Sequence, residues 1–411
     1  MTRPNRKTIY EALGREPVHP FPARMAAGVA LELVAGARKP LRVLDPMMGS
    51  GTALAIARAE GHRAIGVDVD PLSVLIAKVW TTTIDPQVVR DKALEVLERA
   101  RVIFKTLRVR DAYPNADEET RQFIRYWFDG YSRRQLFALA VAIRRVRNAA
   151  VRDALWCAFS RLIITKQAGA SLAMDLSHSR PHKRFTRAPA KPFRGFLNSV
   201  ERVVRNCIVT SSKNRGPSAW IRQGDARRLA VKSASIDLVI TSPPYLNAID
   251  YIRCSKFSLV WMGYRIGELR ELRSDSLGTE RAGTGLREEA AIGRIVAQLQ
   301  LNPTLSSRDQ TTLANYIDDM RRVMYEIARV LSPGGKAVYV IGENTIRGTF
   351  IRNSLIVVAL ARICGLKLYE RRTRMLPANR RYLPPPSRRM RSASLNGRIR
   401  REVVLSFRKP A

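Results

Sequence analysis

The stretch Thr241-Ser242-Pro243-Pro244-Tyr245 brings a hydroxyl, two prolines and an aromatic ring to the end of the apolar run IDLVI. Two consecutive prolines fix two φ angles and remove two backbone donors, so the carbonyl of Pro243 is held in one direction. An exocyclic base amine must be drawn toward tetrahedral geometry before it can attack a methyl group, and two preorganised acceptors, the Ser242 hydroxyl and this carbonyl, can do that. Tyr245 offers a flat face for a base rotated out of its stack. The alternative is a turn in which the prolines do no more than end a strand.

A second candidate site is the glycine turn DPMMGSGT at residues 45–52. Gly49 and Gly51 allow a ligand to approach the backbone closely, and the helix that follows offers unpaired N–H groups at its start. The turn has neither the lysine of a triphosphate-binding loop nor the spacing GxGxxG. Asp45 precedes the glycines and suits a ligand with a positive amine or sulfonium, which indicates S-adenosyl-L-methionine. A tight connection from strand to helix without a ligand is the alternative.

Two more acids end predicted strands. Asp68 lies 17 residues after Gly51, where a carboxylate can accept hydrogen bonds from ribose hydroxyls. Asp225, in QGDARRL, is either an acceptor for an adenine amino group or the N-cap of the segment that follows. Both readings of Asp225 stay open at this point.

The apolar pattern predicts the elements that position these groups. Strands are expected at 41–45, 63–69, 219–225, 236–245, 336–344, 366–375 and 400–409. Helices are expected at 52–61, from Pro71, at 313–331 and at 350–363, with Ser-Pro-Gly-Gly at 332–335 as a breaker before the fifth strand. This alternation of about seven strands with helices is typical of a doubly wound α/β sheet.

The alternation is interrupted between about Asp85 and Pro217, where helical, Arg-rich segments dominate, for example VRDALWCAFSRLIITKQ at 151–167. We interpret residues 85–217 as a helical, basic insertion, which leaves 1–84 and 218–411 for the α/β domain. A later stretch at 273–310, rich in Ser, Gly, Thr and Arg, is expected to be mobile.

Net charge is the strongest global signal, because 72 Lys and Arg face 35 Asp and Glu, a net charge of +37. Such a field favours a polyanionic partner, nucleic acid above all. An arginine-biased proteome would explain part of the excess, but not its concentration in residues 371–411, which hold 13 basic residues and one acid. A membrane surface is disfavoured because no basic amphipathic helix stands out.

Several other classes of protein are disfavoured. No apolar run reaches 18 residues, and the basic N-terminus has no apolar segment, so neither a membrane span nor a secretory signal is expected. The four cysteines are scattered without a CxxC pair, which argues against zinc clusters and disulfide frameworks and fits a reducing cytoplasm. No cysteine follows a proline, so the nucleophile for C5 methylation of cytosine is absent.

Two basic stretches are candidates for phosphate contacts. In LSHSRPHKR, His178 and His182 are four apart, but the proline between them and the lack of a thiol argue against zinc. This loop either contacts phosphates or is a solvated surface, and the tail ANRRYLPPPSRRMR allows the same two readings. The candidate contacts are Arg180, Lys183 and Arg184 in the loop and Arg380, Arg381, Arg388 and Arg389 in the tail.

Taken in order, DPMMGSGT, GVDVDP, GDAR and TSPPY resemble the motifs of the amino-group DNA methyltransferases, which act on cytosine N4 or adenine N6. FPARMAAGVALELV at 21–34 resembles the segment that this family places before the glycine loop. The resemblance covers roughly 20–80 and 218–375, and it implies a Rossmann-like class I methyltransferase fold with a mostly parallel seven-stranded sheet. Many cytosine-N4 members carry the SPPY motif before the glycine loop, whereas here the glycine loop comes first.

The resemblance also implies roles for single residues. The catalytic pocket would comprise Ser242, Pro243, Pro244 and Tyr245. The cofactor site would comprise Asp45, Gly49 and Gly51 at the methionine part, Asp68 at the ribose and Asp225 near the adenine. Phe21, Pro46 and Thr52 would also bind the cofactor. No metal is implied.

The expected function is site-specific transfer of a methyl group from S-adenosyl-L-methionine to a DNA base amine. Cytosine N4 is favoured because serine heads the motif, where adenine-N6 relatives more often have Asp or Asn. Adenine-N6 methylation of DNA, methylation of an RNA base, and a catalytically inactive nucleic-acid-binding protein are the alternatives. A partner restriction nuclease is compatible with the leading expectation.

Overall fold

A computed structural model describes residues 7–21, 24–114, 116–166, 168–176, 181–209, 219–244, 246, 251–274, 276–277, 293, 295–297, 299, 305–346, 349–375 and 401–411. Six predicted site residues lie outside this set: Arg180, Tyr245, Arg380, Arg381, Arg388 and Arg389. The chain forms two compact units. The first unit comprises residues 1–40, 48–223 and 250–273, and the second comprises 41–47, 224–249 and 274–411.

The first unit begins with two short helices and continues with a strand-helix alternation. Its elements here are α1 (Ile9–Leu13), α2 (Ala27–Val34), α3 (Thr52–Ala59), β2 (Arg63–Asp68), α4 (Pro71–Thr81) and β5 (Trp220–Gln223). Strands β2 and β5 are parallel, with Asp68 opposite Gln223. Helix α4 starts where it does because Asp70 caps it and Pro71 occupies its first turn, where a missing N–H is no loss.

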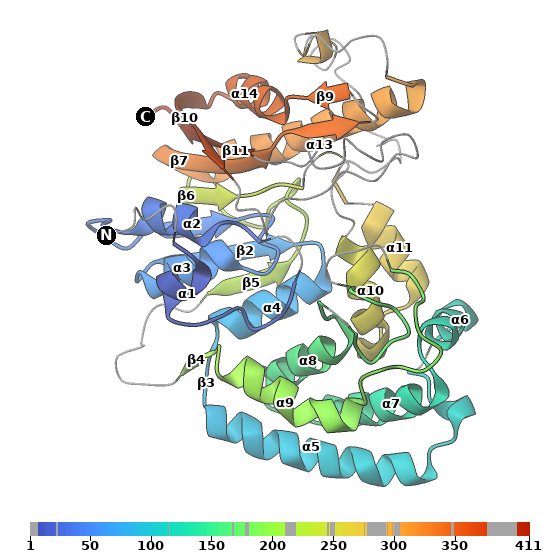
Figure 1. The fold of residues 1–411 in the computed structure, drawn as a ribbon. Helices are drawn as coiled ribbons and strands as arrows, with labels where there is room; N and C mark the ends of the chain where they lie inside the picture. The colour runs from blue at the N-terminus through green and yellow to red at the C-terminus, as the bar shows by residue number, and fades with distance from the viewer. Residues whose placement is uncertain are drawn as a thin grey trace. The chain divides into compact units, whose positions relative to one another are not determined.

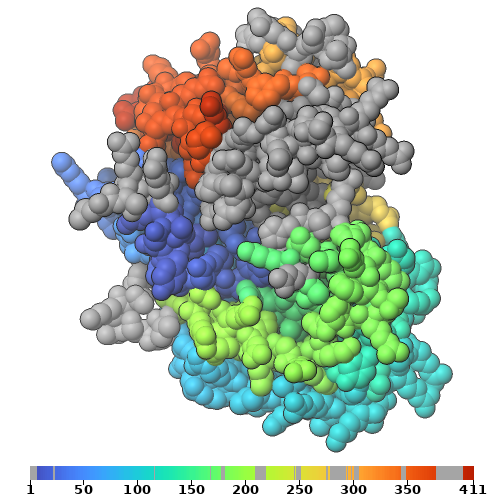
Figure 2. All heavy atoms as spheres, viewed as in Figure 1, coloured from blue at the N-terminus to red at the C-terminus, as the bar shows by residue number. Residues whose placement is uncertain are grey.

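The predicted insertion is helical, and Figure 1 shows its helices following one another from cyan to green. They are α5 (Pro86–Thr106), η2 (Val109–Asp111), α6 (Glu118–Trp127), α7 (Gly130–Arg144), α8 (Ala149–Ile163) and α9 (Pro192–Val204). Two-residue strands β3 (Thr83–Ile84) and β4 (Ile208–Val209) pair in parallel, so the chain enters and leaves this region side by side. In Figure 2 the atoms of these helices form a continuous surface. The first unit ends with α10 (Tyr251–Met262) and α11 (Ile266–Ser274).

The second unit contains most of the sheet. Its strands are β1 (Arg42–Asp45), β6 (Ile236–Thr241), β7 (Leu331–Gly342), β10 (Lys367–Met375) and β11 (Arg401–Arg408), and its long helices are α13 (Ser307–Val330) and α14 (Asn353–Ile363). Strands β1, β6 and β7 are parallel, and β11 runs antiparallel between β7 and β10. The guanidinium of Arg42 and the carboxylate of Asp237 pair at 2.8 Å, which fixes the register of β1 against β6.

The seven-stranded sheet has the order β10-β11-β7-β6-β1-β2-β5. After β1 the chain adds β2 and β5 on one side of it, and later adds β6, β7, β10 and β11 on the other side, so the order reverses direction at β1. This reversal is the switch point of a doubly wound sheet, and ligands of such sheets bind at the carboxyl ends of the strands there. The predicted Rossmann-like α/β fold with a mostly parallel seven-stranded sheet is therefore confirmed.

Several element boundaries differ from the prediction: α13 begins at Ser307 instead of residue 313, and β6 ends at Thr241 instead of residue 245. Two further differences depend on contacts with other strands. Residues 332–335, expected as a break before a strand, lie inside β7, where the register with β6 jumps from Leu331 to Lys336. The backbone of Gly334 and Gly335 exchanges two hydrogen bonds with Lys409, and these contacts hold the irregular segment in the sheet. The helix expected from residue 350 starts at Asn353, because Thr349–Ile351 forms strand β9 against β8 (Asn344–Ile346). Most of the stretch 273–310 lies outside the described residues.

All four cysteines are free, and three of them are buried. Within the described ranges, no helix combines the length and apolar character that crossing a membrane requires. The described residues also contain no group of His, Cys, Asp and Glu side chains that could hold a metal ion.

Candidate functional site

The proline corner begins where β6 ends, and β7 fixes its serine. The Ser242 hydroxyl donates to the carbonyl of Val340 in β7 at an O···O distance of 3.0 Å. A hydroxyl carries one hydrogen and two lone pairs, so donation to a carbonyl leaves the oxygen of Ser242 as an acceptor. Its side chain is half-buried, and Pro243 beside it is buried. The serine is therefore set to accept a hydrogen bond.

Tyr316 of α13 holds the other end of the corner. Its hydroxyl donates to the carbonyl of Pro244 at 3.2 Å. Burial raises the pKa of Tyr316, and the charge of Glu343 raises it further, so the phenol keeps its proton and remains a donor. The motifs of the sequence do not single out this residue. The available signal was a tyrosine on the apolar face of a helix, since a buried phenol needs a partner.

The end of β1 is tied to the end of β6 through Asp45. One oxygen of this buried carboxylate accepts the Thr241 hydroxyl at 2.9 Å and the backbone N–H of Met47 at 3.2 Å. Asp45 and buried Pro46 thus belong to the same unit as the proline corner. Asp45 at the end of β1 therefore contacts Thr241, the residue directly before Ser242, Pro243 and Pro244.

The rest of the glycine turn lies in the first unit, beside Asp68. The N–H of Gly49 donates to the Asp68 carboxylate at 2.8 Å. Gly51 has a φ of +81°, and a Cβ there would lie 2.9 Å from the Cβ of Ala77, so the turn needs glycine for conformation and for space. The ring of Phe21 lies 3.7 Å from the position of a Cβ on Gly49. Phe21 and Asp68 therefore both lie at Gly49, whereas Gly51 lies against Ala77 of α4.

Asp68 and Asp70 form an acidic pair at the end of β2. The Asp70 N–H donates to the Asp68 carboxylate at 2.9 Å. Burial, and then the charge of Asp70, raise the pKa of Asp68 to about 7 against the lowering effect of its backbone hydrogen bonds. Burial raises the pKa of Asp70 to about 6, although the hydroxyl of Ser255 donates to it at 2.5 Å. This edge of the sheet favours ligands that donate hydrogen bonds or carry positive charge.

The glycine turn fits a cofactor with hydroxyl donors and a cationic centre. Thr52, at the first position of α3, is 2% exposed, and its hydroxyl has no hydrogen-bond partner among the described residues. Two glycines with positive φ, one of which also lacks room for a Cβ, therefore lie at one strand-to-helix turn together with an acidic pair and a buried hydroxyl that has no partner among the described residues. These groups match the needs of S-adenosyl-L-methionine, whose ribose donates hydrogen bonds and whose sulfonium is positive.

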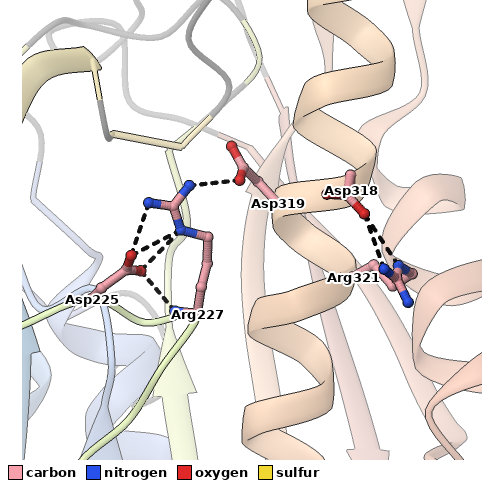
Figure 3. A network of polar contacts seen from close by, with 5 residues as sticks. All are labelled: Asp225, Arg227, Asp318, Asp319 and Arg321. Atoms are coloured by element: carbon pink, nitrogen blue, oxygen red, sulfur yellow. Dashed lines mark hydrogen bonds and ion pairs between the residues drawn. The ribbon is translucent and has the colours of Figure 1, made fainter. Parts of the chain in front are cut away.

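Asp225 is engaged by an arginine, as Figure 3 shows. Its carboxylate accepts the backbone N–H of Arg227 at 2.8 Å and three contacts from the same guanidinium at 2.8–3.1 Å. Arg227 also pairs with Asp319 of α13 at 2.7 Å. Burial lowers the pKa of Arg227, but hydrogen bonds to both acids outweigh it, so the pKa is raised. Turns rather than a helix follow Asp225, so its reading as a helix N-cap is wrong. An adenine amino group bound there would share a carboxylate that Arg227 already holds.

The loop after residue 180 carries exposed basic side chains. The ammonium of Lys183 lies 4.8 Å above the ring of Tyr126, which is 54% exposed on α6. Arg184 is exposed, and its backbone N–H donates to the carbonyl of Leu172. Lys183 and Arg184 are therefore accessible on a loop that hydrogen bonds fix to the helical region.

No family model matches the chain. Over most of its length the chain is similar to curated Type II methyltransferases. It is 24% identical to M.MvaI of Kocuria varians, over 83% of this chain and 80% of the relative. It is 22% identical to M.BsoBI of Geobacillus stearothermophilus, over 88% of this chain and 81% of the relative. A solved structure, the PvuII DNA methyltransferase (cytosine-N4-specific), is 18% identical over 47% of this chain and 50% of that one, with a TM-score of 0.27, too low to carry an argument. The similarity to methyltransferases agrees with the enzyme class expected from the sequence.

Proposed function

We propose that the chain is an S-adenosyl-L-methionine-dependent DNA methyltransferase that methylates an exocyclic base amine, with cytosine N4 as the favoured target. One observation carries this proposal. The Ser242 hydroxyl donates a hydrogen bond to the Val340 carbonyl, which leaves its own oxygen as an acceptor at the carboxyl end of β6, beside a carbonyl that two prolines fix. Such a pair of neutral acceptors is what a base amine requires.

Each residue of the corner has a task in this proposal. Ser242 Oγ and the Pro243 carbonyl accept the two hydrogens of the target amine and draw its nitrogen toward tetrahedral geometry. Tyr316 and Val340 keep the corner rigid from two sides. Tyr245 stacks on the flipped base. The cofactor, when bound, supplies the methyl group on its sulfonium.

The cofactor is assigned to the glycine turn and the acids beside it. Asp68 accepts the ribose hydroxyls, and Asp225, oriented by Arg227, lies at the adenine. Asp45, Gly49 and Gly51 are assigned to the methionine part, and Phe21, Pro46 and Thr52 are assigned to the cofactor without a specified part. The unpartnered Thr52 hydroxyl and the raised pKa of Asp68 support this assignment.

DNA is the proposed substrate. The naming of the curated relatives as Type II methyltransferases and the net charge of +37 support it. Residues 1–84 and 218–411 form the methyltransferase domain in this proposal, and the helical region 85–217 contributes DNA contacts. The proposed phosphate contacts are Arg180, Lys183 and Arg184, with Arg380, Arg381, Arg388 and Arg389 in the tail. A restriction nuclease is the fitting partner in a restriction-modification system of the cytoplasm.

The proposal is tested by supplying the purified chain with radiolabelled S-adenosyl-L-methionine and duplex DNA, single-stranded DNA or RNA. We expect label in duplex DNA at one sequence, recovered as N4-methylcytosine, and no covalent adduct trapped by 5-fluorocytosine. N6-methyladenine alone would refute the choice of base, and label in RNA alone would refute the substrate. Binding of DNA without any transfer would favour an inactive nucleic-acid-binding protein.

A further inference from the structure

Helix α10 begins at Tyr251, six residues after Tyr245, and this first residue contacts Phe21. The rings of Tyr251 and Phe21 stack with their centroids 5.6 Å apart and their planes 10° from parallel. Phe21 is 5% exposed and lies against the Gly49 turn. The ring of Tyr251 therefore backs the side chain that lines this turn.

One helical turn later, the same helix reaches the acidic pair. Ser255 is buried, and its hydroxyl donates to Asp70, which caps α4 and whose N–H donates to Asp68. Residues four apart lie on one face of a helix. The face of α10 that carries Tyr251 and Ser255 thus contacts both the Phe21 side and the Asp68 side of the turn.

We propose that Tyr251 is a positioning residue for the cofactor, which rests on the proposed function: its ring holds Phe21 against the glycine turn. Without that ring, Phe21 gains rotational freedom, and the wall of the cofactor site loses its fixed face. Ser255 supports the arrangement by anchoring the same helix to Asp70.

The contact differs from ordinary core packing in a way that an experiment can detect. Phe257, also on α10, is fully buried, whereas Tyr251 keeps part of its surface exposed beside the turn. A side chain that only packs would change thermal stability and leave cofactor affinity unchanged. A positioning ring changes affinity, and phenylalanine replaces it.

The test measures the Kd of S-adenosyl-L-methionine by calorimetry for the wild type, Tyr251→Phe and Tyr251→Leu, each well below its unfolding temperature. We expect Tyr251→Leu to bind about 2- to 12-fold more weakly, the range of an aromatic pair, and Tyr251→Phe to bind as the wild type does. Tyr325→Leu, at a tyrosine 66% exposed on α13, is the matched control and should not change the Kd. Adding Phe21→Leu to Tyr251→Leu should cost no more than the worse single variant.

Each outcome decides the proposal. A wild-type Kd in Tyr251→Leu, or equal weakening by leucine and phenylalanine, overturns it, because the ring would then have no role. If the losses of cofactor affinity in the two single variants add up in the double variant, Tyr251 does not act through Phe21. If the wild type itself does not bind S-adenosyl-L-methionine, the proposed function fails and this inference falls with it; wild-type binding with unaffected variants removes this inference alone.

Discussion

Neutral groups hold the corner at residues 242–244, whereas the carboxylate of Asp68 holds the turn at residues 48–52. A serine hydroxyl, a tyrosine hydroxyl and backbone carbonyls fix the corner. The turn is fixed by Asp68, whose pKa is about 7 and which lies next to Asp70. The first arrangement suits a neutral amine and should be indifferent to pH near neutrality. The second suits a cation or a hydroxyl donor and should respond to pH.

The largest effect should come from the neutral corner. Ser242→Ala removes one acceptor at the reacting amine while leaving the fold intact. Loss of one preorganised contact of this kind costs about 10²–10³ in kcat, with little change in cofactor Kd. Methyl transfer at saturating substrate measures it, with Ser233→Ala, at an exposed serine before β6, as control. Full activity in Ser242→Ala would mean that the corner does not hold the amine.

The charged turn should show its effect in binding. Asp68→Ala removes the acceptor for the ribose hydroxyls and should weaken cofactor binding by about 1.5–3 kcal/mol, the size of hydrogen bonds to a charged group. Calorimetry on the folded variant measures the change, and Asp111→Ala, at an exposed acid, serves as control. An unchanged Kd would remove Asp68 from the cofactor site, and the contrast between a neutral corner and a charged turn would then not extend to ligand binding.

The Asp225 loop contains charged groups that are partly buried, so it tests the effect of charge on stability rather than on ligand binding. Arg227→Met leaves Asp225 and Asp319 without their shared cation, and we expect a loss of about 1–3 kcal/mol in the free energy of unfolding. Denaturant unfolding measures the loss, and Arg228→Met, at an exposed neighbour, should change little. If Asp319→Asn restores no stability to Arg227→Met, the unpaired charge is not the cause.

The pH dependence of stability tests the acidic pair directly. Burial and the charge of Asp70 raise the pKa of Asp68 to about 7, well above the ordinary value of a carboxyl group, so folding favours its protonated form. Its charge therefore destabilises the fold increasingly as pH rises from about 4 to 7, and fully above pH 7. Asp68→Asn should raise the Tm at pH 8 by a few degrees, as about 1 kcal/mol would, and by less at pH 5. A difference that is equal at both pH values would show that Asp68 does not titrate in this range.

The smallest effect concerns the basic loop. Lys183→Ala and Arg184→Ala should each reduce the slope of log affinity for DNA against log salt by about 0.9 if each side chain neutralises one phosphate. Fluorescence anisotropy with duplex DNA at several salt concentrations measures the slope, and Lys232→Ala, at an exposed lysine before β6, is the control. Slopes equal to the wild type for both variants would make the loop a solvated surface.

The sequence predicted the fold and the local groups of the site because both depend on short patterns. Strand-turn-helix spacing located the turn at Gly49 and Gly51, and an acid at the end of each early strand identified Asp45 and Asp68. The residues that were missed act across long sequence distances. Tyr316 reaches Pro244 from 72 positions away, and this pairing depends on how α13 packs, which no local pattern encodes.

The same distinction accounts for two of the boundary errors and for Asp225. Ser-Pro-Gly-Gly reads as a breaker locally, but its two contacts with Lys409 come from the far end of the chain. Asp225 was recognised as a polar strand end and Arg227 lies two residues away, but the contact of this guanidinium with Asp319 of α13 spans 92 positions. Local sequence patterns predict where elements lie, whereas contacts with distant residues determine the structure at the ends of those elements.

The place of β11 has a consequence for how the polypeptide emerges from the ribosome. This strand is the last of the sheet to be synthesised, yet it lies between β7 and β10 and pairs with both. Until it is made, β10 has no neighbour in the sheet and β7 presents an open edge, which invites pairing with other nascent chains. A message broken before codon 401 would therefore yield an aggregation-prone fragment, and translation must pass that point before this half of the molecule can close.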